Sequence, residues 1–211
     1  MKSWDNTTQT VQTKLGEVLI MNATPPELLA DLSIDAMLQS FRPAKRQKEA
    51  LVEISKLPEG KVTTAQLAGE IVGYITFHPP DRFERWSQGP DRVIELGAIE
   101  VAPKIRRLGV GQKLLRMSFK DARMEDYIVI STEYYWHWDL EDSGMHIWEY
   151  REMMRRIMES VGMVIRDTDE EEISSHPANI LMARYGANVP PSIIKEFEDL
   201  LFMDNSSLFY G

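Results

Sequence analysis

The pattern of apolar and polar positions changes its period between Val93 and Met117. The first part of this stretch is apolar and largely β-branched up to Val101 and stops at Pro103, which predicts a strand and its end. After Gly111, apolar or small residues recur at helical spacing while polar and basic residues take the other face. The stretch therefore predicts a strand, a basic loop with two glycines, and a helix that begins at the glycines.

The same approach predicts elements along the rest of the chain. Before the central stretch we expect a strand over 11–21 interrupted at Gly16, helices over 25–38 and 45–57, and a hairpin of strands 61–67 and 70–77. After it we expect a strand over 127–132, a helix over 144–161, and strands over 163–166 and 180–185. Residues 81–92 form a polar loop long enough to lie over a groove. This order predicts an α/β (α+β) fold in one domain over 1–211, with a C-terminal helical extension at about 190–203.

Composition narrows the range of functions. The sequence has no cysteine, which excludes disulfides and a thiol nucleophile, and it shows neither a long apolar run nor the apolar core of a signal peptide. We therefore expect a cytoplasmic protein without membrane association. The net charge of -9 disfavours nucleic acid and favours a basic partner surface. The histidines lack the close paired spacing of a metal site, so we expect no bound metal.

The predicted loop has the chemistry of a phosphate site. A helix N-terminus offers unpaired backbone N–H groups and the positive end of the helix dipole. Gly109 and Gly111 let a phosphate approach those groups, and Arg106 and Arg107 add positive charge. The spacing excludes a P-loop, because one residue separates the glycines, and a dinucleotide fingerprint, because Leu114 stands where the third glycine is needed.

The motif R-x-x-G-x-G over 106–111, preceded by E-L-G-A-I-E-V-A-P, resembles the coenzyme A pyrophosphate loop of the GNAT N-acetyltransferases. The order of predicted elements is also similar to that of this family. The resemblance implies a central mixed, mostly antiparallel sheet flanked by helices, and acetyl-CoA as co-substrate without a metal. The residues that it implies for cofactor binding are Ile99, Val101, Arg106, Arg107, Leu108, Gly109, Val110, Gly111 and Gln112.

The resemblance also implies catalytic roles. Glu95 matches a strand glutamate that acts as general base in several family members; the alternative is a carboxylate that pairs with a nearby cation. Glu100 is the reserve candidate, because it faces the opposite side of a regular strand unless a bulge intervenes. Met158 stands where many members carry a tyrosine acid. Tyr134, Tyr135 and Tyr150 are the candidate substitutes, and protonation of the thiolate from solvent is the other alternative.

Longer segments, among them T-E-Y-Y-W-H-W-D-L and S-S-H-P-A-N-I-L-M-A-R, resemble a branch of the family found in acetoin-utilising bacteria. This implies transfer of acetyl to a lysine of the AMP-forming acetyl-CoA synthetase, which lowers the activity of that enzyme. Two alternatives stay open: acetylation of a small-molecule amine, and a non-catalytic module that senses acetyl-CoA and binds a partner enzyme. The aromatic run 134–138 and the acidic run 169–172 are either structural or part of a docking surface. The sequence predicts no oligomeric state.

Overall fold

The structure is a computed structural model that describes residues 3–203, apart from the side chain of residue 142. Within these residues the chain forms two compact units. The first comprises residues 3–79 and 94–124, and the second comprises residues 80–93 and 125–203.

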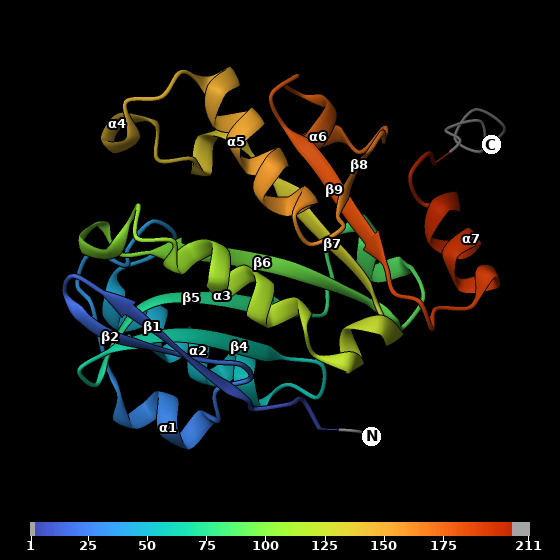
Figure 1. Ribbon diagram of the computed structural model, residues 1–211. Helices are drawn as coiled ribbons and strands as arrows, with labels where there is room; N and C mark the ends of the chain where they lie inside the picture. The colour runs from blue at the N-terminus through green and yellow to red at the C-terminus, as the bar shows by residue number, and fades with distance from the viewer. Residues whose placement is uncertain (1–2, 204–211) are drawn as a thin grey trace, which may run out of the picture. The chain divides into compact units, whose positions relative to one another are not determined.

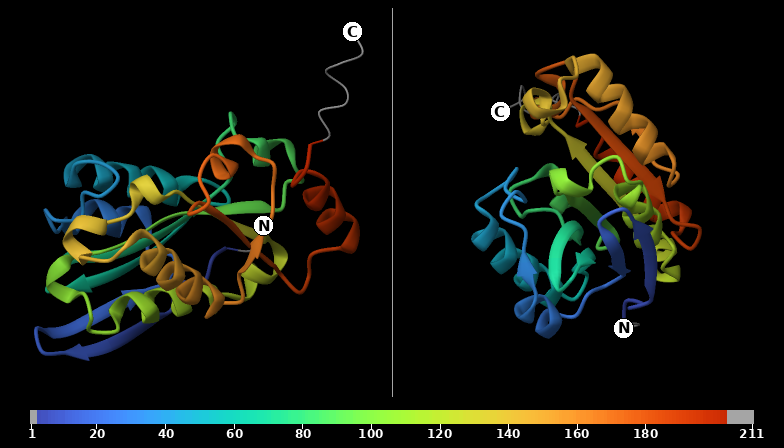
Figure 2. Two further views of the ribbon diagram at one scale, coloured as in Figure 1. Left: turned by 90° about the horizontal axis from the view of Figure 1, so that it is seen from above. Right: turned by 60° about the vertical axis from the view of Figure 1, so that its left-hand side comes forward.

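The first unit is built on a sheet in the order β1-β2-β4-β5-β6, in which neighbouring strands are antiparallel. A short strand, β3, runs parallel to β5, so the expected mixed, mostly antiparallel sheet is confirmed. The strands are β1 (Thr8–Thr13), β2 (Gly16–Met21), β3 (Ser33–Ile34), β4 (Lys61–Leu67), β5 (Glu70–His78) and β6 (Val93–Val101). The β1–β2 hairpin forms one edge of this sheet (Figure 2).

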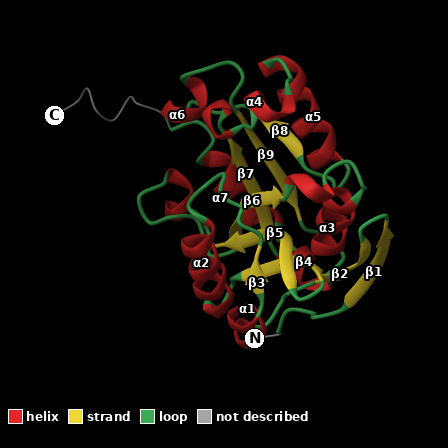
Figure 3. Ribbon diagram, turned by 90° about the vertical axis from the view of Figure 1, so that its left-hand side faces the viewer, coloured by secondary structure: helices red, strands yellow, loops and turns green. Residues whose placement is uncertain are grey.

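Helices cover both faces of this sheet. They are α1 (Pro26–Asp31), α2 (Ala44–Lys56) and α3 (Val110–Phe119). Helices α2 and α3 lie on opposite sides of β4 and β5 (Figure 3). The α3 face receives the odd-numbered side chains of β5, since Phe77 makes an edge contact with Phe119 at 5.5 Å between ring centroids. The even-numbered side chains of β5 therefore point toward the α2 face.

The second unit contains a sheet in the order β7-β9-β8, from β7 (Ile128–Glu133), β9 (Ile180–Tyr185) and β8 (Val164–Arg166). One face of this sheet carries Ile128, Ile130, Leu181 and Ala183, which pack with Phe197 in a common core. The helices are α4 (Leu140–Ser143), α5 (Ile147–Glu159), α6 (Glu171–Ser174) and α7 (Pro191–Asp199). Helix α5 packs along β8, and α7 lies on the other side of β9 (Figure 1).

Most predicted elements are present, with three differences. The strand expected over 11–21 is a hairpin, because Gly16 turns the chain with φ +119°. The helix expected as far as residue 38 ends at Asp31, because Ser33 and Ile34 pair with β5 instead. The helix expected from residue 144 begins at Ile147, where His146 and Glu149 form a capping box. In each case a backbone partner or a cap decides the boundary.

No helix within residues 3–203 is both long enough and apolar enough to cross a membrane.

Candidate active site

The glycine loop opens α3 as the sequence predicts. Gly109 is the N-cap residue and takes a left-handed conformation, with φ +75°. Because Gly109 has no side chain to cap the first turn, the N-cap residue does not compete with a ligand for the N–H groups there. A Cβ at Gly109 would meet no atom within 4 Å, so the requirement for glycine here comes from the backbone conformation alone.

Gly111 has a packing role in addition to the predicted one of admitting a phosphate. A Cβ at this position would lie 3.3 Å from Cγ2 of Val101 on β6. The missing side chain therefore allows the first turn of α3 to pack closely against the strand. Close approach of helix and strand keeps the helix N-terminus at the end of β6, where the predicted cofactor residues begin.

The two arginines of the loop are held differently. Nε of Arg106 donates to the carbonyl oxygen of Val101 at 3.0 Å, which anchors this side chain on β6. Arg107 is exposed and takes a positive φ of 63°, uncommon for a residue with a side chain. The neighbouring Lys104 forms ion pairs with Asp35 and Glu70. Arg107 thus presents its charge to solvent, whereas the Arg106 side chain is held against β6.

The predicted cofactor residues on β6 lie on one face of the strand. Ile99 pairs with Ile75 on the α3 side of the sheet and is only half-buried. Val101 shares that side and is also partly exposed. Leu108 and Gln112 lie in the loop and the first turn of α3, and Val110 is buried beneath them. All nine predicted cofactor residues lie in one strand-loop-helix segment of the first unit.

A β-bulge brings Glu95 and Glu100 to the same face of the sheet. Leu96 pairs with Phe77 and Ala98 with Thr76, so Gly97 has no partner on β5. Beyond the bulge the register continues, and Glu95 lies opposite His78 while Glu100 lies opposite Tyr74. Because cross-strand partners share a face, both carboxylates lie on the α2 side.

The surroundings of Glu100 make it a structural carboxylate. It accepts hydrogen bonds from the Tyr74 hydroxyl at 2.5 Å, the Ser40 backbone N–H at 2.9 Å and the Ser40 hydroxyl at 2.8 Å. Burial, and then the charge of Glu100, raise the pKa of Tyr74, so this hydroxyl remains a donor. The two bonds from Ser40 tie the segment before α2 to β6, and the bond from Tyr74 links β5 to β6.

Glu95 is only 6% exposed and lies beside the bulge. Its cross-strand partner is His78. In the sequence, this histidine was a candidate only for metal binding. A Cβ at Gly97 would lie 2.1 Å from Nε2 of His78, so the imidazole covers the bulge. No periodicity or motif in the sequence signals this contact, because the bulge sets it.

The second unit carries an aromatic surface made of Tyr134, Tyr135, Trp136, Trp148 and His176. Trp136 stacks on Tyr134 at 4.7 Å, and His176 lies against Tyr135 at 4.3 Å and Trp148 at 6.5 Å. Trp136 and Trp148 are each 48% exposed. The Tyr135 N–H donates to Oδ1 of Asn179 at 3.0 Å, which fixes the turn that follows β7.

The candidate general acids lie in this second unit. Met158 is fully buried on α5, so the position at which the resemblance implies a tyrosine acid is part of the core here. Burial, followed by the charges of Glu170 and Glu172, raises the pKa of Tyr134 well above its usual range. Tyr134 therefore gives up its proton less readily than an ordinary tyrosine. Tyr135 contacts His176, and Tyr150 stacks on Trp138 at 5.2 Å.

Two neighbouring segments are more structural than the sequence indicates. Asp169 forms an ion pair with Arg85, and Glu170 caps α6 by accepting the Ile173 N–H at 2.9 Å. Trp86, in the loop expected over a groove, is buried in the core of the second unit, 5.9 Å from Phe197. Glu171 and Glu172 remain exposed, and Glu172 lies beside Tyr134 of the aromatic surface.

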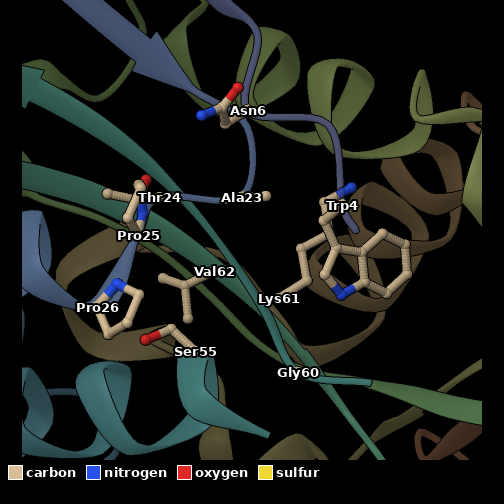
Figure 4. A pocket seen from close by; sticks show the side chains of 10 residues that line it. All are labelled: Trp4, Asn6, Ala23, Thr24, Pro25, Pro26, Ser55, Gly60, Lys61 and Val62. Carbon is tan, nitrogen blue, oxygen red and sulfur yellow. The ribbon is translucent and has the colours of Figure 1, made fainter. Parts of the chain in front are cut away.

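A pocket of about 190 Å³ lies elsewhere in the first unit (Figure 4). Its lining includes Lys61, whose Nζ is bonded to the Ser118 carbonyl oxygen at 2.5 Å and lies 5.0 Å from the Trp4 ring centroid. Asp121, at 3.7 Å, is the opposite charge. Lys61 is 1% exposed, and its burial lowers its pKa to about 8.

A mixed sheet whose bulged strand leads through a basic glycine loop into a helix is the architecture of an acetyltransferase. The chain belongs to the acetyltransferase (GNAT) family, whose model matches residues 32–137. It is 50% identical over 193 residues to proteins of Bacillus licheniformis and Bacillus subtilis, each named acetoin utilization protein AcuA; the match covers 91% of this chain and 92% of each relative. A crystal structure of an acetoin utilization protein from Exiguobacterium sibiricum matches with a TM-score of 0.93 and 42% identity over the full length of both chains.

Proposed function

We propose that this acetyltransferase transfers an acetyl group from acetyl-CoA to a lysine of the AMP-forming acetyl-CoA synthetase and thereby lowers the activity of that enzyme. Membership of the family and the similarity to acetoin utilization proteins support the reaction class. The acceptor follows from the resemblance seen in the sequence and from the surface of the second unit.

The start of α3 has the donor set that a pyrophosphate needs. The N–H groups of residues 108–112 and the dipole of α3 would hold the phosphates, with Arg107 as an exposed cation beside them. Ile99 and Val101 offer partly exposed apolar side chains on the preceding strand. Acetyl-CoA, when bound, supplies the activated acetyl thioester.

Glu95 is the proton acceptor of the proposed reaction. An ammonium group must lose a proton before its nitrogen can attack a carbonyl carbon. Glu95 is buried beside the bulge, whereas Glu100 accepts three hydrogen bonds, two of which hold the segment before α2. This difference supports Glu95 as the base and Glu100 as a positioning residue.

The aromatic surface is the single observation that supports a protein, rather than a small amine, as the acceptor. A small amine needs a closed pocket, whereas a lysine within a folded enzyme needs an exposed docking surface. Two half-exposed tryptophans belong to this surface, and Glu172 lies beside its Tyr134. Aromatic faces next to a carboxylate favour a segment bearing lysine or arginine.

Incubation of the protein with isotopically labelled acetyl-CoA tests this proposal, with intact acetyl-CoA synthetase and a peptide carrying its catalytic lysine as competing acceptors. We expect the intact synthetase to be acetylated much faster than the peptide. Trp136→Ala should lower the rate on the synthetase more than on the peptide. Leu57→Ala, which removes an apolar side chain that is 43% exposed in the first unit, is the matched control and should change neither rate.

Equal rates on protein and peptide would contradict a docking surface. Turnover of free polyamines without turnover of the synthetase would identify a small-molecule enzyme instead. Tight binding of the synthetase without acetyl transfer would identify a non-catalytic module.

A further inference from the structure

We propose that His78 is the proton relay of the site: its Nε2 receives from Glu95 the proton that leaves the acceptor amine and passes it to water. The inference rests on the proposed function, because it assigns a residue to the same reaction. It adds a histidine to a site in which the sequence indicated carboxylates and tyrosines.

The strand register places the two side chains together. His78 is the last residue of β5, and its Cα partner on β6 is Glu95. Directly opposed residues of antiparallel strands have Cβ atoms about 5 Å apart on one face of the sheet. The imidazole is therefore within reach of the carboxylate that takes the ammonium proton.

One hydrogen bond sets the tautomer of this imidazole. Nδ1 of His78 lies 2.8 Å from the carbonyl oxygen of Pro79. A carbonyl oxygen can only accept, so the hydrogen is on Nδ1. In the neutral ring Nε2 then carries the basic lone pair.

The glycine of the bulge fixes where this lone pair lies. Because a Cβ at Gly97 would come within 2.1 Å of Nε2, any other residue would displace the ring. Gly97 is exposed and follows Glu95 by two positions. Nε2 is thus held at the point where β6 departs from regular pairing.

The different exposure of Glu95 and His78 indicates the direction in which the proton moves between them. Glu95 is 6% exposed, whereas His78 is only half-buried, so a proton on the carboxyl group reaches water more easily through the imidazole. Glu95 is the carboxylate that faces His78 from β6. On β4, Lys61 pairs with Phe77 and points to the opposite face of the sheet. On the face that carries His78, the next charged residue of β6 is Glu100, which lies opposite Tyr74 of β5.

The proton balance is complete without another reactant. The ammonium gives one proton to Glu95, the amine nitrogen forms the C–N bond, and the C–S bond breaks to release the thiolate. Glu95 then passes its proton to Nε2, and the imidazolium releases it to water. The second proton that the nitrogen loses ends on the thiol of coenzyme A.

The test is a double-mutant cycle of His78→Ala and Glu95→Gln, measured with intact acetyl-CoA synthetase and, in parallel, free polyamines as acceptors. We expect His78→Ala to lower kcat on the order of 10²-fold without changing acetyl-CoA affinity. The double variant should be no slower than Glu95→Gln alone, because the relay acts only through Glu95. Added imidazole should restore part of the rate of His78→Ala, and more basic imidazoles of equal size should restore more.

Two further variants separate a relay from a structural role. Gly97→Ala keeps the imidazole but displaces it, so its rate should fall and imidazole should not restore it. His146→Asn replaces another histidine by a residue that can still cap α5, and its rate should stay at the wild-type level. Thermal unfolding of each variant establishes that it is folded.

If wild type is active and His78→Ala does not lower the rate, the relay is overturned and the proposed function is left intact. The same holds if the fold-reductions caused by His78→Ala and Glu95→Gln multiply in the double variant. A rescue that depends on the size but not the basicity of the added base also overturns it. A wild type that acetylates neither acceptor overturns the proposed function and the relay with it.

Discussion

Glu95 and Glu100 are five positions apart, and their different surroundings separate a catalytic role from a structural one. The bulge at Gly97 places both on one face, so the parity of their positions does not distinguish them. Hydrogen bonding does, because Tyr74 and Ser40 hold Glu100 with three donors. The surroundings of Glu100, rather than its strand position, therefore favour Glu95 as the proposed base.

Glu95→Gln keeps the size of the side chain and removes its basicity. Acetyl-CoA affinity should survive while turnover at neutral pH falls on the order of 10²-fold or more, and a higher pH should recover part of the rate. Isothermal calorimetry and steady-state kinetics measure the two quantities.

Glu100→Gln is the matched comparison for Glu95→Gln. It should lower the free energy of unfolding by about 1–3 kcal/mol, since it disturbs buried hydrogen bonds, and should reduce turnover less than Glu95→Gln. Near wild-type turnover in Glu95→Gln would make that residue structural and Glu100 the next candidate.

Lys61 makes stability depend on pH. Its pKa falls from 10.5 to about 8 in the folded protein because of burial, against the opposing attraction of Asp121. Between these pH values the unfolded chain binds more protons, so the free energy of unfolding rises with pH. Each tenfold change in proton affinity corresponds to about 1.4 kcal/mol, so the total effect is at most a few kcal/mol.

Urea unfolding of wild type and Lys61→Met, from about pH 7 to about pH 10, checks this contribution. Wild type should gain stability relative to Lys61→Met as the pH rises through about 8. Lys56→Met, which removes an exposed lysine of α2, should show no such change. A stability difference between wild type and Lys61→Met that stays constant with pH would contradict the buried, partly neutral lysine.

At the scale of the element, β6, the glycine loop and α3 act together. Gly109 supplies the left-handed residue that turns the chain into the helix, and Gly111 lets the helix approach Val101. Arg106 bonds to the carbonyl oxygen of Val101 from the same loop. The N–H groups of the first turn are consequently held in a fixed position relative to β6.

Substitution of the two glycines tests the phosphate site. Gly111→Val should weaken acetyl-CoA binding by well over tenfold, more than about 1.4 kcal/mol, because the new side chain crowds Val101 and moves the helix N-terminus. Gly109→Ala should also weaken binding, since its φ of +75° is strained for alanine. Calorimetry with acetyl-CoA measures both affinities.

Gly69→Ala is the matched control for Gly109→Ala. Gly69 has φ +81° and, like Gly109, would place a Cβ in open space, but it lies in the β4–β5 turn. It should lower stability by a similar amount and leave acetyl-CoA affinity unchanged. Wild-type affinity in folded Gly109→Ala and Gly111→Val would exclude the helix start as the pyrophosphate site.

At the scale of the molecule, the net charge of -9 is a property of the whole chain, whereas the loop before α3 is locally basic. Arg106 and Arg107 suit a phosphate-bearing co-substrate. Glu172, which is exposed beside the aromatic surface, suits a basic acceptor. The two units thus offer opposite charges to the two reactants of the proposed transfer.

Several elements follow from local sequence. The hairpin of β4 and β5, helix α2, and the β6-loop-α3 segment were predictable because apolar periodicity, Pro43 and the glycines act over a few neighbouring residues. The short β3 was not, because a two-residue strand forms only when β5 is beside it. The second function of Gly111 also depends on a residue ten positions away, Val101.

The sequence by itself determined the element order, the glycine loop at the start of α3, and the family, because each depends on residues that are close together in the chain. Tertiary structure decided which carboxylate is structural, that Glu95 and Glu100 share a face, and that His78 lies over Gly97. These facts depend on one extra residue in the pairing of β5 with β6. A bulge reverses the alternation of side chains beyond it, and pairing between strands, rather than the period of either strand, places it.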